Sequence, residues 1–546
     1  MDRLGRKVCN EQAATGRPTP EREASAMSGE GVKKGTGLLR SGMIVGAMTM
    51  ISRVLGLARD VVIATLFGAG SGADAFFIAF RIPNFLRRLF AEGAFNQAFV
   101  PILSEYATNR ERREVRELLD ATAGTLAIVL LGITVLAVIG SPWLVWVFAP
   151  GFQGDEPGKL ALTAEMLQIT FPYLLLISLT AFSGSVLNSY GRFAVPAFTP
   201  VLLNLSMIGA ALWLAPLLDV PVMSLAWGVL IAGIAQLLFQ IPFLVRIGLL
   251  PRFRPGFRHA GVRRIMRLMG PAMFGVSVSQ INLLLDTVLA SLLVSGSVSW
   301  LYYSDRLVEL PLGVFGIAIA TVILPALSRQ HASDDPAHFA RMIDWGIRAV
   351  LLIGVPAALA LLVLAEALLI TLFHYGAMTD HDISMAAQSL RAYALGLLAF
   401  MLIKVLAPGY YARQDTKTPV TIGIVAMVAN MVFNLILMWP LAHAGLALAT
   451  ALSAWLNAAL LGHGLLKRGV LVFQPGWGRI ALQLLSGCAL LFAVIVLLSP
   501  DWQVWLGWGL VTRILVLGGL ILAAVATYFG WLGATGMRLR HFRLRG

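Results

Sequence analysis

Long apolar blocks alternate with short polar segments along most of the chain. From about residue 38 onward there are roughly fourteen such blocks, each long enough to cross a ~30 Å hydrocarbon core as a helix. The blocks are continuous apolar runs rather than ten-residue alternations, so they predict helical spans and not a β-barrel. Their approximate centres are Leu55, Leu89, Val135, Leu176, Met207, Ile234, Leu283, Ala318, Ala360, Leu398, Val428, Ser453, Leu490 and Gly519.

Basic residues fall in every second gap between the blocks. They are concentrated in the N-terminal segment and in residues 109–116, 246–267, 467–468 and 538–545, whereas the other gaps contain no lysine or arginine apart from Lys159. Short cytoplasmic loops retain lysine and arginine, so this alternation predicts an even number of spans with both termini cytoplasmic. The net charge of +14 then reflects topology, and nucleic acid is not an expected partner.

Composition agrees with this interpretation, because the 546-residue chain is 58% hydrophobic and only 13% charged. Residues 1–37 are polar and lack the apolar core of a signal peptide. They are predicted to form a disordered cytoplasmic extension.

An internal repeat organises the spans. "SYGRFAVP" (189–196) corresponds to "ARQDTKTP" (412–419), and "RDVVIATLFGAG" (59–70) corresponds to "LDTVLASLLVSG" (285–296). The offset is about 225 residues, or six spans, so the two copies would face the same way as parallel repeats. This predicts an all-α fold with an N-lobe at 38–260, a C-lobe at 261–472 and a cleft between them. Residues 473–546 would add two helices and a basic cytoplasmic tail.

Charged residues concentrate in the first, second and eighth spans. Each costs about 2.5 to 3.5 kcal/mol at the centre of a lipid-facing helix, so these side chains must face protein or water. Arginines outnumber the acids, which favours an anionic ligand in the cleft, and guanidinium groups suit phosphate or pyrophosphate. The alternative is that ion pairs such as Arg306 with Glu309 only hold helices together. Helical periodicity places three of these charged residues and one amide on the same face of the second span: Arg81, Asn84, Arg88 and Glu92.

A second polar group lies in the C-terminal half. Asp286 follows Asn282 on the seventh span, Asn430 and Asn434 share a face of the eleventh, and Thr450 lies on the twelfth. Their oxygens are candidate ligands for a small cation. Polar contacts between helices would explain the same pattern.

Four segments resemble the MurJ (MviN) family of lipid II flippases, within the multidrug, oligosaccharidyl-lipid and polysaccharide exporter superfamily. They are "SRVLGLARD", "GADAFFIAFRIPNFLRRLFAEGAFNQAFVPILSEY", "SGSVSWLYYSDRLVELPLGVFG" and "KVLAPGYYARQDTKTPV". The resemblance runs from about residue 38 to the end of the chain. It implies a two-lobed transporter of the bacterial inner membrane that moves lipid II, an undecaprenyl-pyrophosphate-linked peptidoglycan precursor, from the cytoplasmic to the periplasmic leaflet.

The resemblance also implies roles for particular residues. Its essential cavity arginines correspond to Arg53, Arg59, Arg87 and Arg306, and its important acids to Asp74, Glu92 and Glu309. The two added helices are expected to form a groove for the lipid tail. Some members bind sodium at positions that match Asp286, Asn430, Asn434 and Thr450, whereas members without the acid are expected to use the membrane potential.

Alternative functions would place different demands on the sequence. An exporter of another polyprenyl-linked oligosaccharide would share these features, but an exporter of cationic drugs would need an acidic or aromatic cavity. An enzyme acting on polyprenyl phosphates would need an Asp-rich magnesium motif or a nucleophile with its base, which the sequence lacks. A scaffold for cell-wall synthesis proteins would tolerate loss of its cationic residues. The expected partners are lipid II, membrane lipids and cell-wall synthesis proteins.

Overall fold

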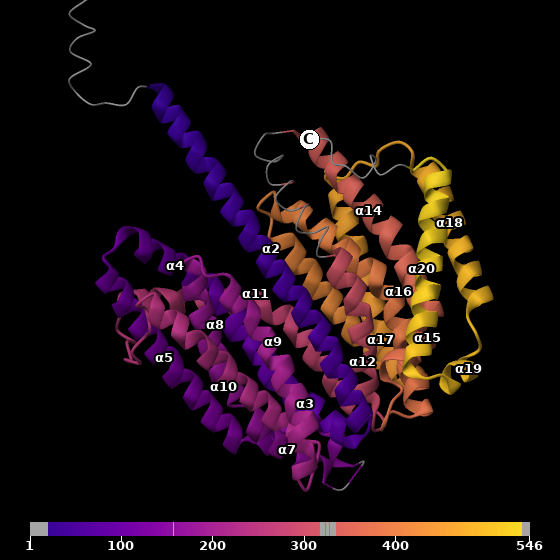
Figure 1. Ribbon diagram of the computed structural model, residues 1–546, viewed down its shortest axis with the longest axis horizontal. Coiled ribbons are helices and arrows are strands. Elements are labelled where there is room, and N and C mark those ends of the chain that lie inside the picture. The colour runs from indigo at the N-terminus through magenta and orange to yellow at the C-terminus, as the bar shows by residue number, and fades with distance from the viewer. Residues whose placement is uncertain are drawn as a thin grey trace, which may run out of the picture.

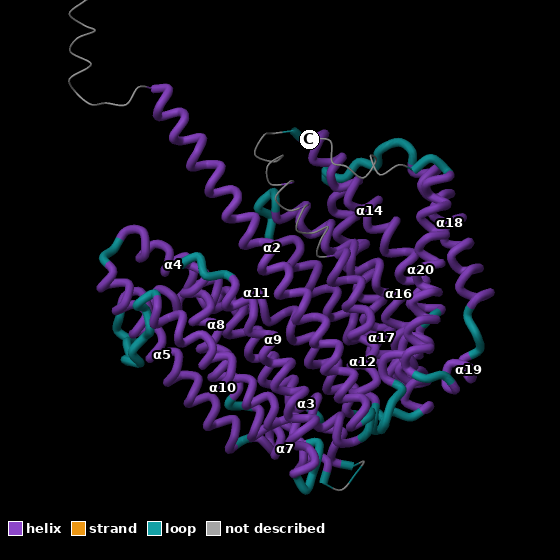
Figure 2. The backbone as a smooth tube through the Cα atoms, in the orientation of Figure 1, coloured by secondary structure: helices purple, strands orange, loops and turns teal. Residues whose placement is uncertain are grey.

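The computed structural model describes residues 20–537 except 155, 157, 317–322, 324–326 and 328–334, with the backbone alone described for residues 20–41, 91–92 and 274–279. Within these ranges the secondary structure is helical, without strands (Figure 2). The first half comprises α2 (Pro20–Phe67), α3 (Ser71–Arg87), η1 (Arg88–Phe95), α4 (Asn96–Asn109), α5 (Arg112–Ile139), α6 (Ser141–Phe148), η2 (Pro150–Gln153), α7 (Lys159–Thr170), α8 (Tyr173–Ser189), α9 (Ala194–Gly209), η3 (Ala210–Leu214), η4 (Ala215–Leu217) and α10 (Met223–Arg246).

The second half has the same all-helical character. It comprises α11 (Ala260–Ser291), α12 (Ser297–Pro311), η5 (Leu312–Gly316), α14 (Pro336–Val363), α15 (Ala365–Phe373), α16 (Asp380–Tyr411), α17 (Lys417–Lys467), α18 (Trp477–Leu498), α19 (Trp502–Gly507) and α20 (Leu510–Ala534). Each predicted span centre lies in one of these helices, except Ala318, which falls outside the described residues.

The chain is a polytopic membrane protein. Among the described residues, nine helices are long and apolar enough to cross a membrane: 112–139, 159–189, 194–217, 223–246, 336–363, 380–411, 417–467, 477–498 and 510–534. The helices that carry the predicted cleft charges are not among these nine. One of the nine, α17, bends sharply at Ala442, whose φ of 47° and ψ of −129° are not helical. Its two arms account for two of the predicted spans.

α2 begins earlier than the sequence predicts. Its first residue is Pro20, so residues 20–37 are helical in the structure, although they belong to the segment predicted to be a disordered extension. The prediction rested on polar composition, which removes the apolar surface for packing but does not prevent a helix from extending past the end of a span.

The helices form one bundle, in which both described chain ends lie on the same side (Figure 1). We call this side the near end, and the side where α2 ends and α3 begins the far end. Helices α2, α8, α9 and α10 pack together in the first half, and α12, α14, α16 and α17 in the second, while α11 contacts both η1 and α17. The added pair α18 and α20 packs on α14 and α15 at the edge of the second half.

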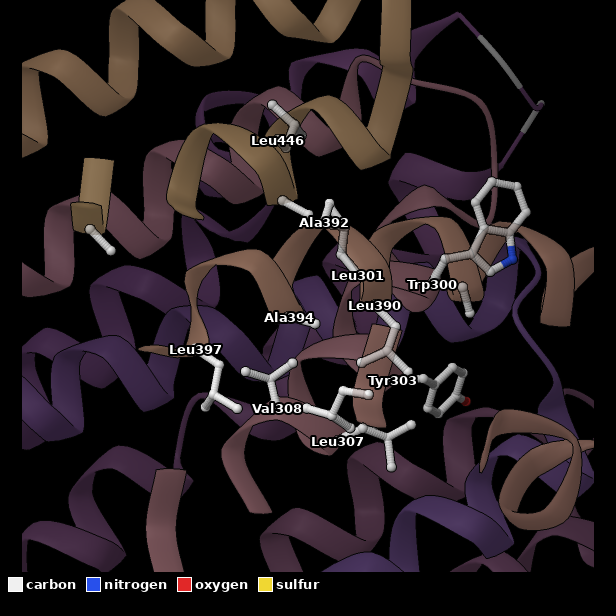
Figure 3. Close-up of a cluster of buried hydrophobic side chains, with 14 of the residues drawn as sticks. Trp300, Leu301, Tyr303, Leu307, Val308, Leu390, Ala392, Ala394, Leu397 and Leu446 are labelled. Carbon is white, nitrogen blue, oxygen red and sulfur yellow. The ribbon is translucent and has the colours of Figure 1, made fainter. Parts of the chain in front are cut away.

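The core of the second half lies between α12 and α16. Figure 3 shows Trp300, Leu301, Tyr303, Leu307 and Val308 of α12 facing Leu390, Ala392, Ala394 and Leu397 of α16. All are buried. This apolar face fixes the rotation of α12, so its remaining face presents Tyr302, Asp305, Arg306 and Glu309 to the first half.

Two π-helical segments interrupt the charged helices. η1 follows α3, and η5 follows α12. A π segment adds a residue to the turn and rotates the side chains that follow it. Upstream of η1, Pro83 cannot donate to the Ala79 carbonyl, and Thr170 Oγ1 donates to that oxygen at 3.0 Å instead.

Candidate functional site

Two arginines from opposite halves of the chain share one carboxylate. Arg59 of α2 donates from Nη2 to Asp60 Oδ1 at 2.7 Å, and Arg306 Nε of α12 lies 3.3 Å from Asp60 Oδ2. Tyr302 Oη accepts from Arg59 at 3.0 Å and from Arg306 at 3.2 Å, and donates to Asp60 at 2.9 Å. Asp60 is only 1% exposed, so α2 and α12 are joined through a buried ionic network.

Each of the two arginines in this network also bonds to a further residue. Arg59 Nη1 also donates to Asn204 Oδ1 of α9 at 3.1 Å, and the Arg59 side chain is almost fully buried. Arg306 instead keeps a third of its side chain exposed and donates to Glu309 Oε2 at 2.8 Å. Two acids therefore balance two guanidinium groups in this state, and Arg306 is the more accessible of the pair.

Arg53 lies on α2, N-terminal to Arg59. Its guanidinium occupies the space beside Gly313, where a Cβ atom would collide with Nη1. Gly313 belongs to η5, so the first span contacts the π segment that follows α12. An alanine at this position would force the guanidinium to move.

A small cavity of about 120 Å³ lies between α3, η1, α11 and α12. Its charged and amide residues are Arg81, Asn84, Arg88, Gln280, Asp305, Arg306 and Glu309. The predicted face of the second span is confirmed for Arg81, Asn84 and Arg88, which line this cavity together. Arg87 does not line it, but its Nε donates to Asn84 Oδ1 at 2.8 Å. Glu92 lies in η1, and its side chain is outside the described part of the structure.

The structure places Asp74 in a separate cluster at the far end. Asp74 Oδ1 accepts from Ser299 Oγ at 2.6 Å and from Ser299 N at 2.9 Å, while Oδ2 accepts from Gly296 N at 2.7 Å. Lys159 Nζ lies 3.3 Å from Oδ2, and both charged side chains are fully buried. The start of α3 is thus bonded to the start of α12.

Backbone contacts close the far end further. Ala377 N donates to Thr65 O at 2.8 Å, and Tyr303 Oη donates to Gly68 O at 2.9 Å. Gly68 and Gly376 both have positive φ, and a Cβ on either would strike the backbone of the opposite segment. The last turn of α2 therefore lies directly against the segment between α15 and α16.

The second polar group also comes together. Asn434 Nδ2 donates to Asp286 Oδ1 at 2.7 Å and to Asn430 Oδ1 at 2.9 Å, and Asn430 lies 3.5 Å from Thr450 Oγ1. With its amide turned, Asn430 donates to Asn282 Oδ1 at 2.9 Å. Asn434 Oδ1 is buried and has no hydrogen-bond partner among the described residues. The structure therefore brings Asp286, Asn430, Asn434 and Thr450 together.

Comparison with known proteins identifies the family. The family described as "Lipid II flippase MurJ" matches residues 63–516. The chain belongs to the MurJ family. A "Probable lipid II flippase MurJ" of Vibrio cholerae is 51% identical over 519 residues, covering 93% of this chain and 98% of that protein. The "Lipid II flippase MurJ" of Burkholderia cenocepacia is 42% identical over 515 residues, covering 93% and 99%.

Solved structures support membership of the MurJ family. "Lipid II flippase MurJ, inward closed conformation" is 25% identical, with a TM-score of 0.77 over 90% of this chain and 98% of that one. An inward-facing multidrug resistance MATE family transporter of the MOP superfamily shares the fold at 14% identity, with a TM-score of 0.61 over 80% and 97%. The expected family is confirmed, and the MATE family transporter shows that the fold is shared more widely.

Several site residues of this MurJ family member were not predicted, among them Asp60, Tyr302, Asn204 and Lys159. Tyr302 and Asn204 complete the network around Arg59. Asn204 lacks the polar partner one turn away that marked Asn430 and Asn434, and Tyr302 lies beside more conspicuous charges. Lys159 was more conspicuous, because it is a lysine in a gap otherwise free of basic residues. Its burial against Asp74 explains why it departs from the charge pattern.

Proposed function

We propose that this chain is a lipid II flippase that moves the undecaprenyl-pyrophosphate-linked peptidoglycan precursor across the bacterial inner membrane. The observation that carries the proposal is the pair Arg59 and Arg306, which come from opposite halves and converge on Asp60. Guanidinium groups form paired hydrogen bonds with phosphate oxygens, so the two arginines suit the pyrophosphate of such a lipid. Membership of a transporter family agrees with a role in transport and not in catalysis.

The architecture that we propose is two parallel six-helix lobes plus two added helices, with fourteen spans in all. Corresponding helices of the two halves begin at nearly the same separation along the chain. Ser71 begins α3 and Ser297 begins α12, and likewise Arg112 begins α5 and Pro336 begins α14. The π segments recur likewise, from Arg88 in η1 to Leu312 in η5. A repeated irregularity of this kind supports an internal repeat more specifically than repeated hydropathy does.

In this mechanism the pyrophosphate displaces acids from arginines. Arg306 is the accessible partner, held by Asp60 and Glu309, and a bound pyrophosphate would replace these carboxylates as its acceptor. Releasing Asp60 from Arg306 would loosen the connection between α2 and α12. The halves could then rock, opening the far end and closing the near end, as in alternating access.

The tail of the substrate would remain in an apolar environment. A cavity of about 430 Å³ between α12, α14, α15, α18 and α20 is lined almost wholly by apolar side chains, including Leu310, Phe315, Leu368, Ile495 and Phe529. It lies on the lobe that carries the two added helices. This supports the assignment of α18 and α20 to a groove for the polyprenyl chain.

The orientation follows from the distribution of charge. The basic gaps belong to the near end, so the near end would face the cytoplasm and the far end the periplasm. Both chain termini would then be cytoplasmic. The contacts of Asp74 with Ser299 and Gly296 would seal the periplasmic side in this conformation.

A sodium ion suits the group around Asp286. The oxygens of Asp286, Asn282, Asn430, Asn434 and Thr450 form a hard-ligand set, and the buried Asn434 Oδ1 lacks a donor. Among the described residues no group of three or more His, Cys, Asp or Glu side chains could hold a transition metal. A bound cation would neutralise the Asp286 carboxylate and link α11 to α17.

The test is growth rescue in bacteria depleted of their own lipid II flippase. The wild-type chain should restore growth, and the variant Arg113→Ala should do so equally, because that side chain is 87% exposed and far from the network. Failure of the wild-type chain to rescue at normal membrane abundance would contradict the proposal. Efflux of a cationic drug without rescue would favour a multidrug exporter instead.

A further inference from the structure

A basic pocket of about 210 Å³ lies at the near end, outside the site described above. It is bounded by α14, by the start of α18 and by the two residues that follow Thr535. The lining residues are Trp345, Arg348, Ala349, Leu352, Gly476, Arg479, Ile480, Gln483, Gly536 and Met537. The pocket therefore joins the second half of the chain to both added helices.

Two arginines line the pocket with unused donors. Arg348 is fixed from one side, since Nε lies 2.7 Å from Asp344 Oδ2 and Nη2 donates to Gln474 O at 2.8 Å. Its Nη1 makes no hydrogen bond to a described residue. Arg479 uses Nη2 to donate to Thr535 O at 2.8 Å, which leaves Nε and Nη1 without a bond in the described structure. Asp344 offsets one of the two positive charges, so the pocket keeps a cationic excess.

The end of a helix adds to this positive character. The pocket borders Gly476, the N-cap of the 22-residue helix α18, whose dipole favours an anion.

The surroundings indicate that the anion belongs to a lipid. Leu352 lines both this pocket and the apolar cavity between α14, α18 and α20. Pro356 of that cavity lies two turns beyond Arg348, or about 12 Å along α14 at 1.5 Å per residue. A headgroup held at the pocket would thus direct its chain along apolar surface toward the middle of the membrane. Four more arginines follow Met537 in the sequence: Arg538, Arg540, Arg543 and Arg545.

We infer that this pocket binds the phosphate of an anionic phospholipid from the leaflet at the near end. Basic pockets between helices on the cytoplasmic side are suited to such headgroups. The bound lipid would pin the start of α18 to α14 and so set the position of the added pair. This inference goes beyond transport, and the lipid is distinct from the transported one.

The test measures lipid-dependent thermal stability of the purified full-length chain in detergent. Phosphatidylglycerol should raise the melting temperature, and phosphatidylcholine should not. Arg479→Gln and Arg348→Lys, which keeps the charge beside Asp344 but removes the free Nη1 donor, should each weaken the phosphatidylglycerol response about fivefold in the half-saturating concentration. Arg113→Gln, which removes one exposed arginine elsewhere, should respond as the wild type does. Unchanged melting temperatures without lipid would confirm that both pocket variants fold.

Several results would overturn the inference. One is a response to phosphatidylglycerol that survives in both pocket variants. Another is an equal response to inorganic phosphate alone, which would assign the pocket to a free anion. A response to a polyprenyl pyrophosphate but not to phosphatidylglycerol would assign it to the substrate path. Because growth rescue is a separate measurement, failure here leaves the transport proposal standing.

Discussion

Asp74 accepts a 2.6 Å hydrogen bond from Ser299 Oγ, which joins the start of α3 to the start of α12 across 225 residues of sequence. The carboxylate also meets Lys159 at 3.3 Å, so a buried charge pair lies at this connection. Buried charges are costly unless they are fully paired and hydrogen-bonded. Asp74 therefore holds the far end closed, and it is separate from the arginine network. We call the contacts of Asp74 with Ser299, Gly296 and Lys159 the latch.

Replacing Asp74 should open this latch. Asp74→Asn keeps the shape but leaves Lys159 buried without a counter-ion, which destabilises the closed state by about 3 to 5 kcal/mol. Ser297 is fully buried in this state, so a cysteine there reports on opening. In a background with Cys9 and Cys488 replaced by serine, maleimide labelling of Ser297→Cys should accelerate more than tenfold.

Two controls make the latch experiment decisive. A cysteine at Gly154, which is exposed and has open space around it, should react at the same rate with and without Asp74→Asn. Adding Lys159→Met to Asp74→Asn removes the unpaired charge and should restore much of the protection. Equal labelling rates in all three backgrounds would show that the charge pair does not hold the far end closed.

Gly313 should help to position the Arg53 guanidinium. A Cβ there would collide with this group, which is the far end of a flexible side chain, so Gly313→Ala should displace it and reduce transport by less than Arg53→Ala does. The double variant should be no worse than Arg53→Ala alone, because both changes act on the same contact. Gly423→Ala, with nothing within 4 Å, is the matched control and should rescue growth normally.

Arg513 should anchor the added helices. This buried arginine of α20 donates to four backbone oxygens: Trp505 O at 3.0 Å, Ile370 O at 3.2 Å, His374 O at 3.1 Å and Leu506 O at 3.0 Å. Arg513→Met leaves these carbonyls unpaired and should lower stability by about 3 kcal/mol or more. Thermal unfolding in detergent measures this, with Arg113→Met expected to match the wild type.

The group around Asp286 should confer sodium dependence. Asp286→Asn keeps the hydrogen-bonding shape but removes the charge that attracts a cation, so sodium should no longer stabilise the purified protein against heat. The wild type should be stabilised by sodium chloride relative to choline chloride at equal ionic strength. If both proteins respond identically to the two salts, the group is polar packing between α11 and α17.

Local patterns in the sequence predicted much of this molecule. Apolar runs located the spans, because a lipid-facing helix must be apolar over its whole length. Periodicity on the second span placed Arg81, Asn84 and Arg88 on one face, and the structure confirms it. Periodicity did not select Arg87, which the family resemblance alone suggested, and the structure places it beside Asn84 but outside the cavity.

Contacts between distant segments were beyond such reasoning. Nothing local to Asp60 indicates that Arg306, in the other half of the chain, approaches its second oxygen. Likewise, Arg513 is a charge in an apolar span, but its partners are backbone carbonyls, which carry no sequence signature. Pairing across the bundle depends on how α2, α12 and α20 are rotated, and apolar packing such as that of α12 on α16 decides this rotation.

The central claim is that the arginines bind the translocated pyrophosphate lipid. The most direct measurement is exposure of lipid II at the outer leaflet of cells depleted of their own flippase. It would compare the wild-type chain with Arg53→Ala, Arg87→Ala and Arg306→Ala at matched membrane abundance. We expect the wild type to restore exposure and all three variants to fail. Full exposure in all three variants would show that these charges are structural, which would contradict the mechanism.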